Sequence, residues 1–194
     1  MSLRHRLAKL LFEACLLKRI ERTGYSYLGT GKENVASHSF GVVFCTFILC
    51  KLFQGQVNEE RALKMALLHD FPEARIGDFN AVNKLYNQAD EFRALKEAFF
   101  GLSFEEEVLK LFEEYRQKET LEAKIVHDAD TLDLMVQLKE QKDLNNPFAE
   151  RWLNYAKRRL ILEESKRLSE ALLETEWCSW WIERLIKEKD EKEP

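Results

Sequence analysis

Apolar residues recur at helical spacing along nearly the whole of this chain, beginning with Leu3, Leu7 and Leu10. No segment shows several residues of clean apolar and polar alternation, which is the pattern of a half-buried strand. Only two prolines, Pro72 and Pro147, interrupt the interior, and few positions therefore forbid a continuing helix. The sequence predicts an all-α fold.

Capping residues and prolines place the expected helix boundaries. Asn58 can cap a helix that ends near His69, and a short new turn can start at Pro72 and carry Glu73. The helix expected over residues 35–53 is apolar on most sides, which predicts a central position. The remaining helices are expected over residues 2–21, 88–100, 103–118, 120–139 and 169–187, with one more starting near 147 and a loop or short helix over 78–84. From about residue 187 a charged tail is expected to fray.

Composition limits the classes of function. The net charge of −4 argues against broad electrostatic capture of a nucleic-acid polymer. The four cysteines form no CxxC pair, which favours free thiols in a reducing compartment. The longest apolar stretch, residues 40–50, is too short to span a bilayer, and no signal-peptide pattern is present. We therefore expect a cytoplasmic protein that does not bind membranes.

Four residues have the chemistry of a divalent-metal site: His38, the adjacent pair His69-Asp70, and Asp130. Two imidazoles and two carboxylates make a donor set of mixed nitrogen and oxygen character. Adjacent residues within a helix point about 100° apart, but the break at Pro72 allows His69 and Asp70 to turn toward one ion. We expect three helices to converge on the ion, as in helical-bundle metal sites.

The strings ENVASHS, ALLHDFPEARIGD and HDADTLD together resemble the HD-domain phosphohydrolase superfamily, whose signature is H…HD…D. The resemblance is closest to the 5′-deoxynucleotidases and related nucleotidases of that superfamily, and it extends over roughly residues 18–140. It implies a single HD domain over residues 1–194, a helical bundle with a metal site between its helices. Residues 141–194 are then a C-terminal helical extension packed on this core.

The same resemblance implies roles for further residues. Glu73 and Asp78 match the catalytic glutamate and the GD aspartate of the nucleotidase branch, and Arg22 matches its basic residue. A guanidinium suits a phosphate clamp, and Lys84 and Lys32 are weaker candidates for the same work. The implied function is hydrolysis of a (deoxy)nucleoside 5′-monophosphate with one divalent ion, which could be Mn, Co, Ni, Fe, Zn or Mg.

Alternatives remain open at this point. Another HD reaction, on a nucleotide phosphodiester or pyrophosphate, would call for extra histidines, and only His5 and His127 remain. A non-catalytic metal- or nucleotide-binding module is the second rival. Asp128 is an alternative to Asp130 as the last metal ligand. His127 directly precedes Asp128, and the two form a second His-Asp pair that resembles His69-Asp70. The aromatic C-terminal helices suggest a homodimer.

The chain departs from the family pattern at two places. Thr23 stands where an aromatic residue often follows the basic one, and Phe79-Asn80-Ala81 replaces a segment that typically contains prolines. Both lie where the resemblance would place the base and the sugar. The metal and the phosphate are therefore better specified than the nucleoside.

Overall fold

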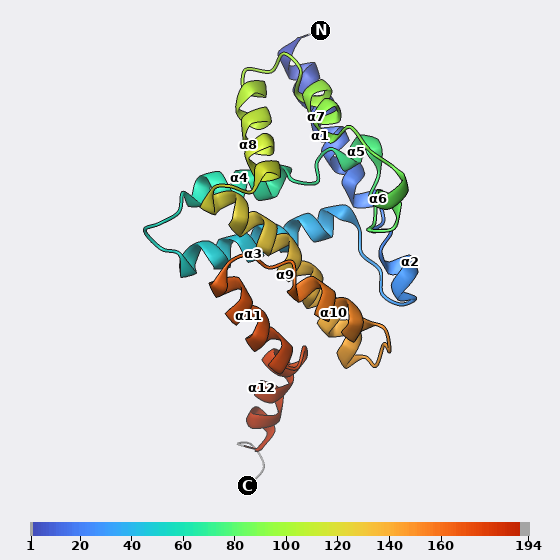
Figure 1. The fold of residues 1–194 in the computed structure, drawn as a ribbon, viewed down its shortest axis with the longest axis vertical. Helices are drawn as coiled ribbons and strands as arrows, with labels where there is room; N and C mark the ends of the chain where they lie inside the picture. Colours follow the sequence, from blue (N-terminus) through green and yellow to red (C-terminus); the bar gives the residue numbers. More distant parts are fainter. Residues whose placement is uncertain (1, 191–194) are drawn as a thin grey trace.

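The computed structural model describes residues 2–190, with side chains to residue 187. Within that range the chain is helical, and its only β-type pairing is an isolated bridge between Glu21 and Asn34. The predicted all-α class is thus confirmed (Figure 1). The elements are α1 (Leu3–Leu16), η1 (Leu17–Arg19), α2 (Tyr25–Leu28), α3 (Val35–Leu52), α4 (Glu59–Leu68), α5 (Glu73–Ile76), α6 (Asn83–Tyr86), α7 (Glu91–Phe99), α8 (Glu105–Gln117), α9 (Leu121–Asp143), α10 (Ala149–Lys157), α11 (Glu163–Glu174) and α12 (Ser179–Asp190).

Helices α3 and α9 cross at the centre of the molecule (Figure 1). α9 packs against α3, α4, α8, α10 and α11, so neighbours cover it on several sides. This explains why α9 lacks one clear apolar face: buried residues, among them Ile125, Ala129 and Met135, occur all round it. The expectation that the helix beginning at Val35 would be central is also met.

The interior consists of two clusters of buried apolar residues. The first cluster includes Val42, Ala66 and Ala129 and joins α3, α4, α9 and α10. The second includes Val35 and Phe71 and joins the start of α3 to α7 and α8. Along α3, His38 therefore lies between Val35 of the second cluster and Val42 of the first. His69 and Asp70 have the same position between Ala66 and Phe71.

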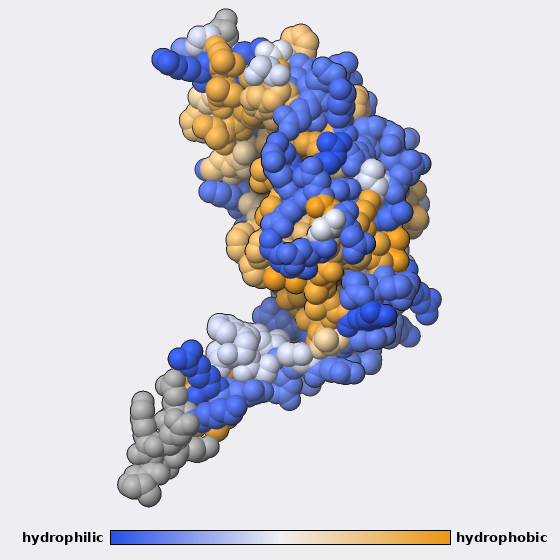
Figure 2. Space-filling view, turned by 90° about the vertical axis from the view of Figure 1, so that its left-hand side faces the viewer, coloured by the Kyte–Doolittle hydropathy of each residue, from blue (hydrophilic) through white to orange (hydrophobic). Residues whose placement is uncertain are grey.

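The C-terminal part differs from the expectation of one helix over residues 169–187. The structure has two helices there, α11 and α12, because Thr175 takes an extended backbone conformation (φ −90°, ψ 126°). The backbone N–H of Trp177 donates to a carboxylate oxygen of Asp143 at 3.0 Å, which ties the break to the end of α9. α12 then stands out from the body of the molecule (Figures 1 and 2).

Other boundaries shift by a few residues. The first helix ends at Leu16 and continues only as the short turn η1, whereas α9 extends four residues past the expected 139. The loop expected after residue 21 contains the short helix α2. α12 continues to Asp190, into the segment expected to fray, and residues 191–194 lie outside the described part of the chain.

By length and composition alone, α3 could cross a membrane. Its place in the fold gives another reason for its apolar character. Val42 and Leu49 are fully buried on α3, and the helix packs against α4 and α9. Core helices of soluble proteins commonly have this composition, so the helix does not by itself indicate a membrane protein.

The packing of α3 against α9 beside Asp133 depends on a glycine. A Cβ atom added to Gly41 would lie 1.8 Å from Oδ1 of Asp133 and 2.6 Å from its Cγ. Asp133 is 5 % exposed, and its other oxygen, Oδ2, lies 2.7 Å from Nδ1 of His38. Only a residue without a side chain leaves room for this buried hydrogen bond between the two helices.

We predict that Gly41→Ala lowers the free energy of unfolding by about 1–3 kcal/mol, because the methyl group must displace Asp133 from His38. Urea unfolding followed by circular dichroism measures this change. In an Asp133→Ala background the same substitution should cost much less, since the atoms that the methyl group meets are gone. Equal costs in the two backgrounds would show that Gly41 has no such coupling to Asp133.

Candidate metal centre and phosphate site

The structure brings the four predicted metal ligands together from three places in the fold. His38 lies in the first turn of α3, which Asn34 caps by accepting the N–H of Ser37. His69 and Asp70 lie in the turn between α4 and α5, and Asp130 lies on α9. Nε2 of His38 is 3.3 Å from Oδ1 of Asp130 and 3.5 Å from Oδ2 of Asp70, which in turn is 3.2 Å from Nε2 of His69.

The two histidines present the nitrogen that a metal requires. Nδ1 of His69 lies 2.7 Å from the carbonyl oxygen of Ala66, which can only accept, so Nδ1 donates. Nδ1 of His38 likewise donates to the carboxylate of Asp133. Each neutral ring then carries its lone pair on Nε2, and both Nε2 atoms are buried without a hydrogen-bond partner.

These nitrogens and a carboxylate oxygen of Asp130 all lie within 4.8 Å of one another. Buried polar atoms without a partner are rare and need an explanation. A cation bound between them would supply it, and a histidine held through its second nitrogen by a carboxylate or a carbonyl is the usual arrangement at metal sites. The residues present fit a divalent ion.

Negative charge dominates the site. Burial, the largest single effect, lowers the pKa of His38, and Arg22 acts in the same direction. The carboxylates of Asp130, Asp133 and Asp70 together outweigh both and raise that pKa to about 10. A position that holds a proton this firmly between carboxylates can exchange it for a metal cation, because metal binding and protonation compete for the same lone pair.

Glu73 begins α5 directly after the turn that carries Asp70. It is 9 % exposed, and its Oε2 is buried without a hydrogen-bond partner. Burial, followed by the charges of Asp70 and Asp78, raises the pKa of Glu73 to about 9. The side chain is therefore an unpaired carboxyl group at the edge of the metal centre, where it can exchange a proton.

Asp78 does not act as a helix cap. Its Oδ2 accepts from the backbone N–H of Thr23 at 2.5 Å and from the Thr23 hydroxyl at 2.7 Å. The side-chain amide of Asn80 donates to the same hydroxyl oxygen at 3.0 Å. The two departures from the family pattern thus form one hydrogen-bonded network, and it holds Asp78. Gly77 adopts φ 79° and ψ 166°, a conformation that essentially only glycine takes.

The predicted phosphate-binding residues have different surroundings. Nη1 of Arg22 lies 3.5 Å from Oδ2 of Asp70, with the arginine side chain 17 % exposed. Lys84 is exposed on α6, and its ammonium group has no hydrogen bond or ion pair with the part of the chain that the structure describes. Lys32 pairs with Glu21 at 3.3 Å. Arg22 is thus the one of the three in direct contact with a predicted ligand.

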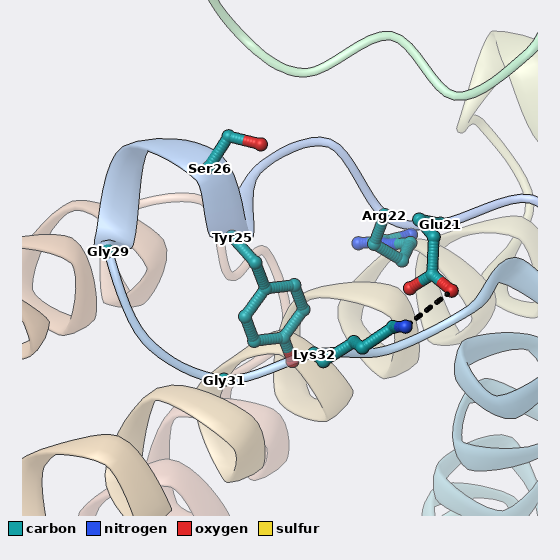
Figure 3. A pocket seen from close by; sticks show the side chains of 7 residues that line it. All are labelled: Glu21, Arg22, Tyr25, Ser26, Gly29, Gly31 and Lys32. Carbon is teal, nitrogen blue, oxygen red and sulfur yellow. Dashed lines mark ion pairs between the residues drawn. The ribbon is translucent and has the colours of Figure 1, made fainter.

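A pocket of about 340 Å³ lies next to Arg22 (Figure 3). Arg22, Tyr25 and Lys32 line it, together with Glu21, Ser26, Gly29 and Gly31. Its volume is at the lower end of the range of small-ligand pockets. Arg22 therefore contacts Asp70 of the candidate metal centre and also lines this pocket.

Sequence reasoning missed two residues that touch the predicted ligands. Asp133 binds His38, and its position one helical turn after Asp130 was the only available signal. Nη2 of Arg159 donates to Oδ2 of Asp130 at 3.2 Å. Arg159 follows α10, in the segment where the resemblance gave no guidance. The pair His127-Asp128 has a different role: Oδ1 and Oδ2 of Asp128 accept backbone N–H groups at 2.9 and 2.8 Å from residues 161 and 162.

Comparisons with known proteins identify relatives of this chain. The chain is 31% identical over 173 residues to the 5′-deoxynucleotidase hdd1 of Schizosaccharomyces pombe, covering 74% of this chain and 85% of that one. It is 30% identical over 135 residues to the 5′-deoxynucleotidase HDDC2 of Danio rerio, covering 66% of each. The match thus spans about two thirds of the zebrafish relative.

Solved structures give the same fold. A conserved hypothetical protein from Pyrococcus furiosus superposes with a TM-score of 0.68 at 31% identity, over 87% of this chain and 99% of that one. A predicted metal-dependent phosphohydrolase from Magnetospirillum magnetotacticum has a TM-score of 0.68 at 22% identity, over 88% and 90% of the two chains, which supports the fold alone. The family model described as "HD domain" matches residues 14–171, and the chain therefore belongs to the HD-domain family.

Proposed function

We propose that this protein is a metal-dependent phosphohydrolase, a 5′-nucleotidase that converts (deoxy)nucleoside 5′-monophosphates to nucleoside and phosphate. The observation that carries the proposal is the pair of buried, unpartnered Nε2 atoms of His38 and His69 beside Asp130. Arg22 and Glu73 adjoin this group. The names of the fission-yeast and zebrafish relatives support the reaction type.

The metal ligands in this proposal are His38, His69, Asp70 and Asp130. A divalent ion bound there would lower the pKa of a coordinated water and polarise a phosphoryl oxygen. The chain's own residues position the substrate and neutralise its charge, which is most of what phosphoryl transfer requires. An N₂O₂ donor set with open positions does not select among Mn, Co, Ni, Fe, Zn and Mg. The availability of each metal in the cell then decides which one is bound.

Four side chains act around the ion. Arg22 keeps most of its five N–H donors for a phosphate group while one donates to Asp70. Glu73 orients the attacking water or exchanges a proton near the leaving group, and its buried, unpaired carboxyl suits that work. Asp78 contacts a substrate hydroxyl through Oδ1, because Thr23 occupies only Oδ2. Lys84 contributes longer-range positive charge.

The rival reaction, cleavage of a phosphodiester or pyrophosphate at a two-metal site, is less well supported. His5 is exposed and lies next to the Ser2 hydroxyl, and His127 pairs with Asp128. A second trio of possible ligands, Glu33, His38 and Asp133, shares His38 with the first. A single catalytic ion fits these contacts better. A non-catalytic binding module would have no use for an unpaired, buried Glu73.

We also propose that residues 1–194 form one cytoplasmic domain that pairs as a homodimer. The four cysteines are free, which suits a reducing compartment. Apolar side chains gather over the middle of the face drawn in Figure 2. α12 carries exposed Trp180, Leu185 and Ile186, and α3 carries an exposed row of Phe40 and Phe44. A second copy would cover such surfaces.

The proposed reaction is tested by stripping the purified protein with chelator and reloading it with each of the six metals. Phosphate release is then measured with nucleoside monophosphates, cyclic nucleotides and dinucleotides. We expect turnover of the monophosphates with at least one metal and little of the others. Asp70→Ala should abolish metal binding. No turnover of any monophosphate with any metal would overturn the proposal, and an unchanged metal content in Asp70→Ala would refute the site.

Glu73→Gln should lower kcat by about 10²–10⁴-fold, because the amide cannot exchange the proton. Metal affinity, measured by titration of the stripped protein, should stay within about threefold. Glu119→Gln, which removes an exposed carboxylate elsewhere, is the matched control and should behave as wild type. If Glu73→Gln loses the metal, Glu73 is a ligand or a structural group.

The homodimer predicts a particle of twice the chain mass of 22.9 kDa by light scattering. Trp180→Glu places a charge on the exposed face of α12 and should shift the population toward monomer, whereas Lys110→Glu on α8 should not. A wild-type mass of one chain at all concentrations would contradict the proposed pairing.

A further inference from the structure

Two arginines contact the carboxylates of the metal centre in the same way. Nη1 of Arg22 lies 3.5 Å from Oδ2 of Asp70, and Nη2 of Arg159 lies 3.2 Å from Oδ2 of Asp130. Nε2 of His38 lies 3.5 and 3.3 Å from the same two aspartates. The arginines come from distant parts of the chain, one preceding α2 and the other following α10.

The backbone that carries Arg159 is fastened to α9. Both carboxylate oxygens of Asp128 accept backbone N–H groups, one from Ile161 and one from Leu162. Asp128 is fully buried and stands two residues before Asp130. Residues two apart on a helix point about 200° apart, so one helix presents Asp130 to the metal centre and Asp128 to this loop. The loop is therefore placed by the same helix that supplies a ligand.

The side chain of Arg159 is partly open to solvent. It is 34 % exposed, against 17 % for Arg22, and the two aspartates are 19 and 20 % exposed. A guanidinium has five N–H donors in a planar fork, and within the described chain the one contact of the Arg159 guanidinium is to Asp130. It thus keeps donors for a bound anion without leaving the carboxylate.

We propose that Arg159 is a second phosphate-binding residue, which works with Arg22 to select the dianionic terminal phosphate of a monoester over the monoanionic phosphate of a diester. This deepens the proposed function and rests on it. Two guanidinium groups match the two negative charges of a monoester, and each can bind phosphate oxygens in bidentate fashion.

Nearby charges support this placement. Burial, and next to it the positive charge of Arg159, lowers the pKa of Lys118, whereas the charge of Asp130 acts to raise it. Lys118 ends α8 in the left-handed backbone conformation (φ 55°). The positive charge of Lys84 also lowers the pKa of Lys118. A protein of net charge −4 thus gathers positive side chains beside its metal centre.

The test compares Arg159→Gln with Arg158→Gln, which removes the same charge from the neighbouring, exposed position. Three quantities are measured on Mn²⁺-loaded protein: the Kd of Mn²⁺, the Kd of inorganic phosphate by calorimetry, and kcat/KM for p-nitrophenyl phosphate and bis(p-nitrophenyl) phosphate. We expect Arg159→Gln to weaken phosphate binding about tenfold or more, with the Kd of Mn²⁺ within about threefold. Arg158→Gln should match wild type in all three.

The monoester and the diester should respond differently. kcat/KM for the monoester should fall at least about tenfold in Arg159→Gln, and that for the diester by less than threefold. Arg159→Lys, which keeps the charge but loses the planar fork, should recover only part of the loss. An unchanged Kd for phosphate overturns the proposal. So does a Kd for Mn²⁺ that weakens as much as that for phosphate, since Arg159 would then only position Asp130.

These outcomes separate this inference from the proposed reaction. If the wild-type protein hydrolyses no monophosphate but its phosphate binding depends on Arg159, the reaction fails and the phosphate site stands. If turnover is normal and the Kd for phosphate does not depend on Arg159, the proposed reaction stands and the proposed role of Arg159 is wrong.

Discussion

The buried contact between His38 and Asp133 is the interaction on which the candidate site depends. The hydrogen bond requires α3 and α9 to approach closely, and the lack of a side chain at Gly41 permits that approach. It also settles which imidazole nitrogen carries the proton, so that Nε2 faces Asp70 and Asp130. The packing of the two helices therefore also fixes the orientation of the His38 ring. A shift of either helix would turn that ring away from the site.

The position of the site between the two apolar clusters follows from the same packing. His38 is preceded along α3 by a residue of one cluster and followed by a residue of the other, and the turn that holds His69 passes between them in the same way. The polar residues of the candidate site lie where the two clusters meet, with residues of each cluster on either side along the chain. The chain thereby holds charged side chains close together without placing them inside either core.

Local patterns predicted much of this arrangement. Helical periodicity and the proline after His69 depend on neighbouring residues, so the all-α class and the turn carrying Asp70 were visible in the sequence, and the spacing of chemically distinctive residues suggested the ligands. Asp133 and Arg159 were not visible, since their roles come from helix packing. The break at Thr175 was missed for the same reason: it is tied to a carboxylate thirty-four residues before Trp177.

The role of Asp128 changes where the functional unit ends. The sequence motifs that resemble the family end near residue 140, which made the C-terminal helices look like a separate extension. A chain cut at that point would leave the fully buried Asp128 carboxylate without the two N–H groups that satisfy it, and would remove the only side chain bound to the outer oxygen of Asp130 within the described residues. The smallest self-sufficient form of this centre therefore reaches at least to Leu162, so α10 and the loop that follows it belong to the same structural unit as the candidate site.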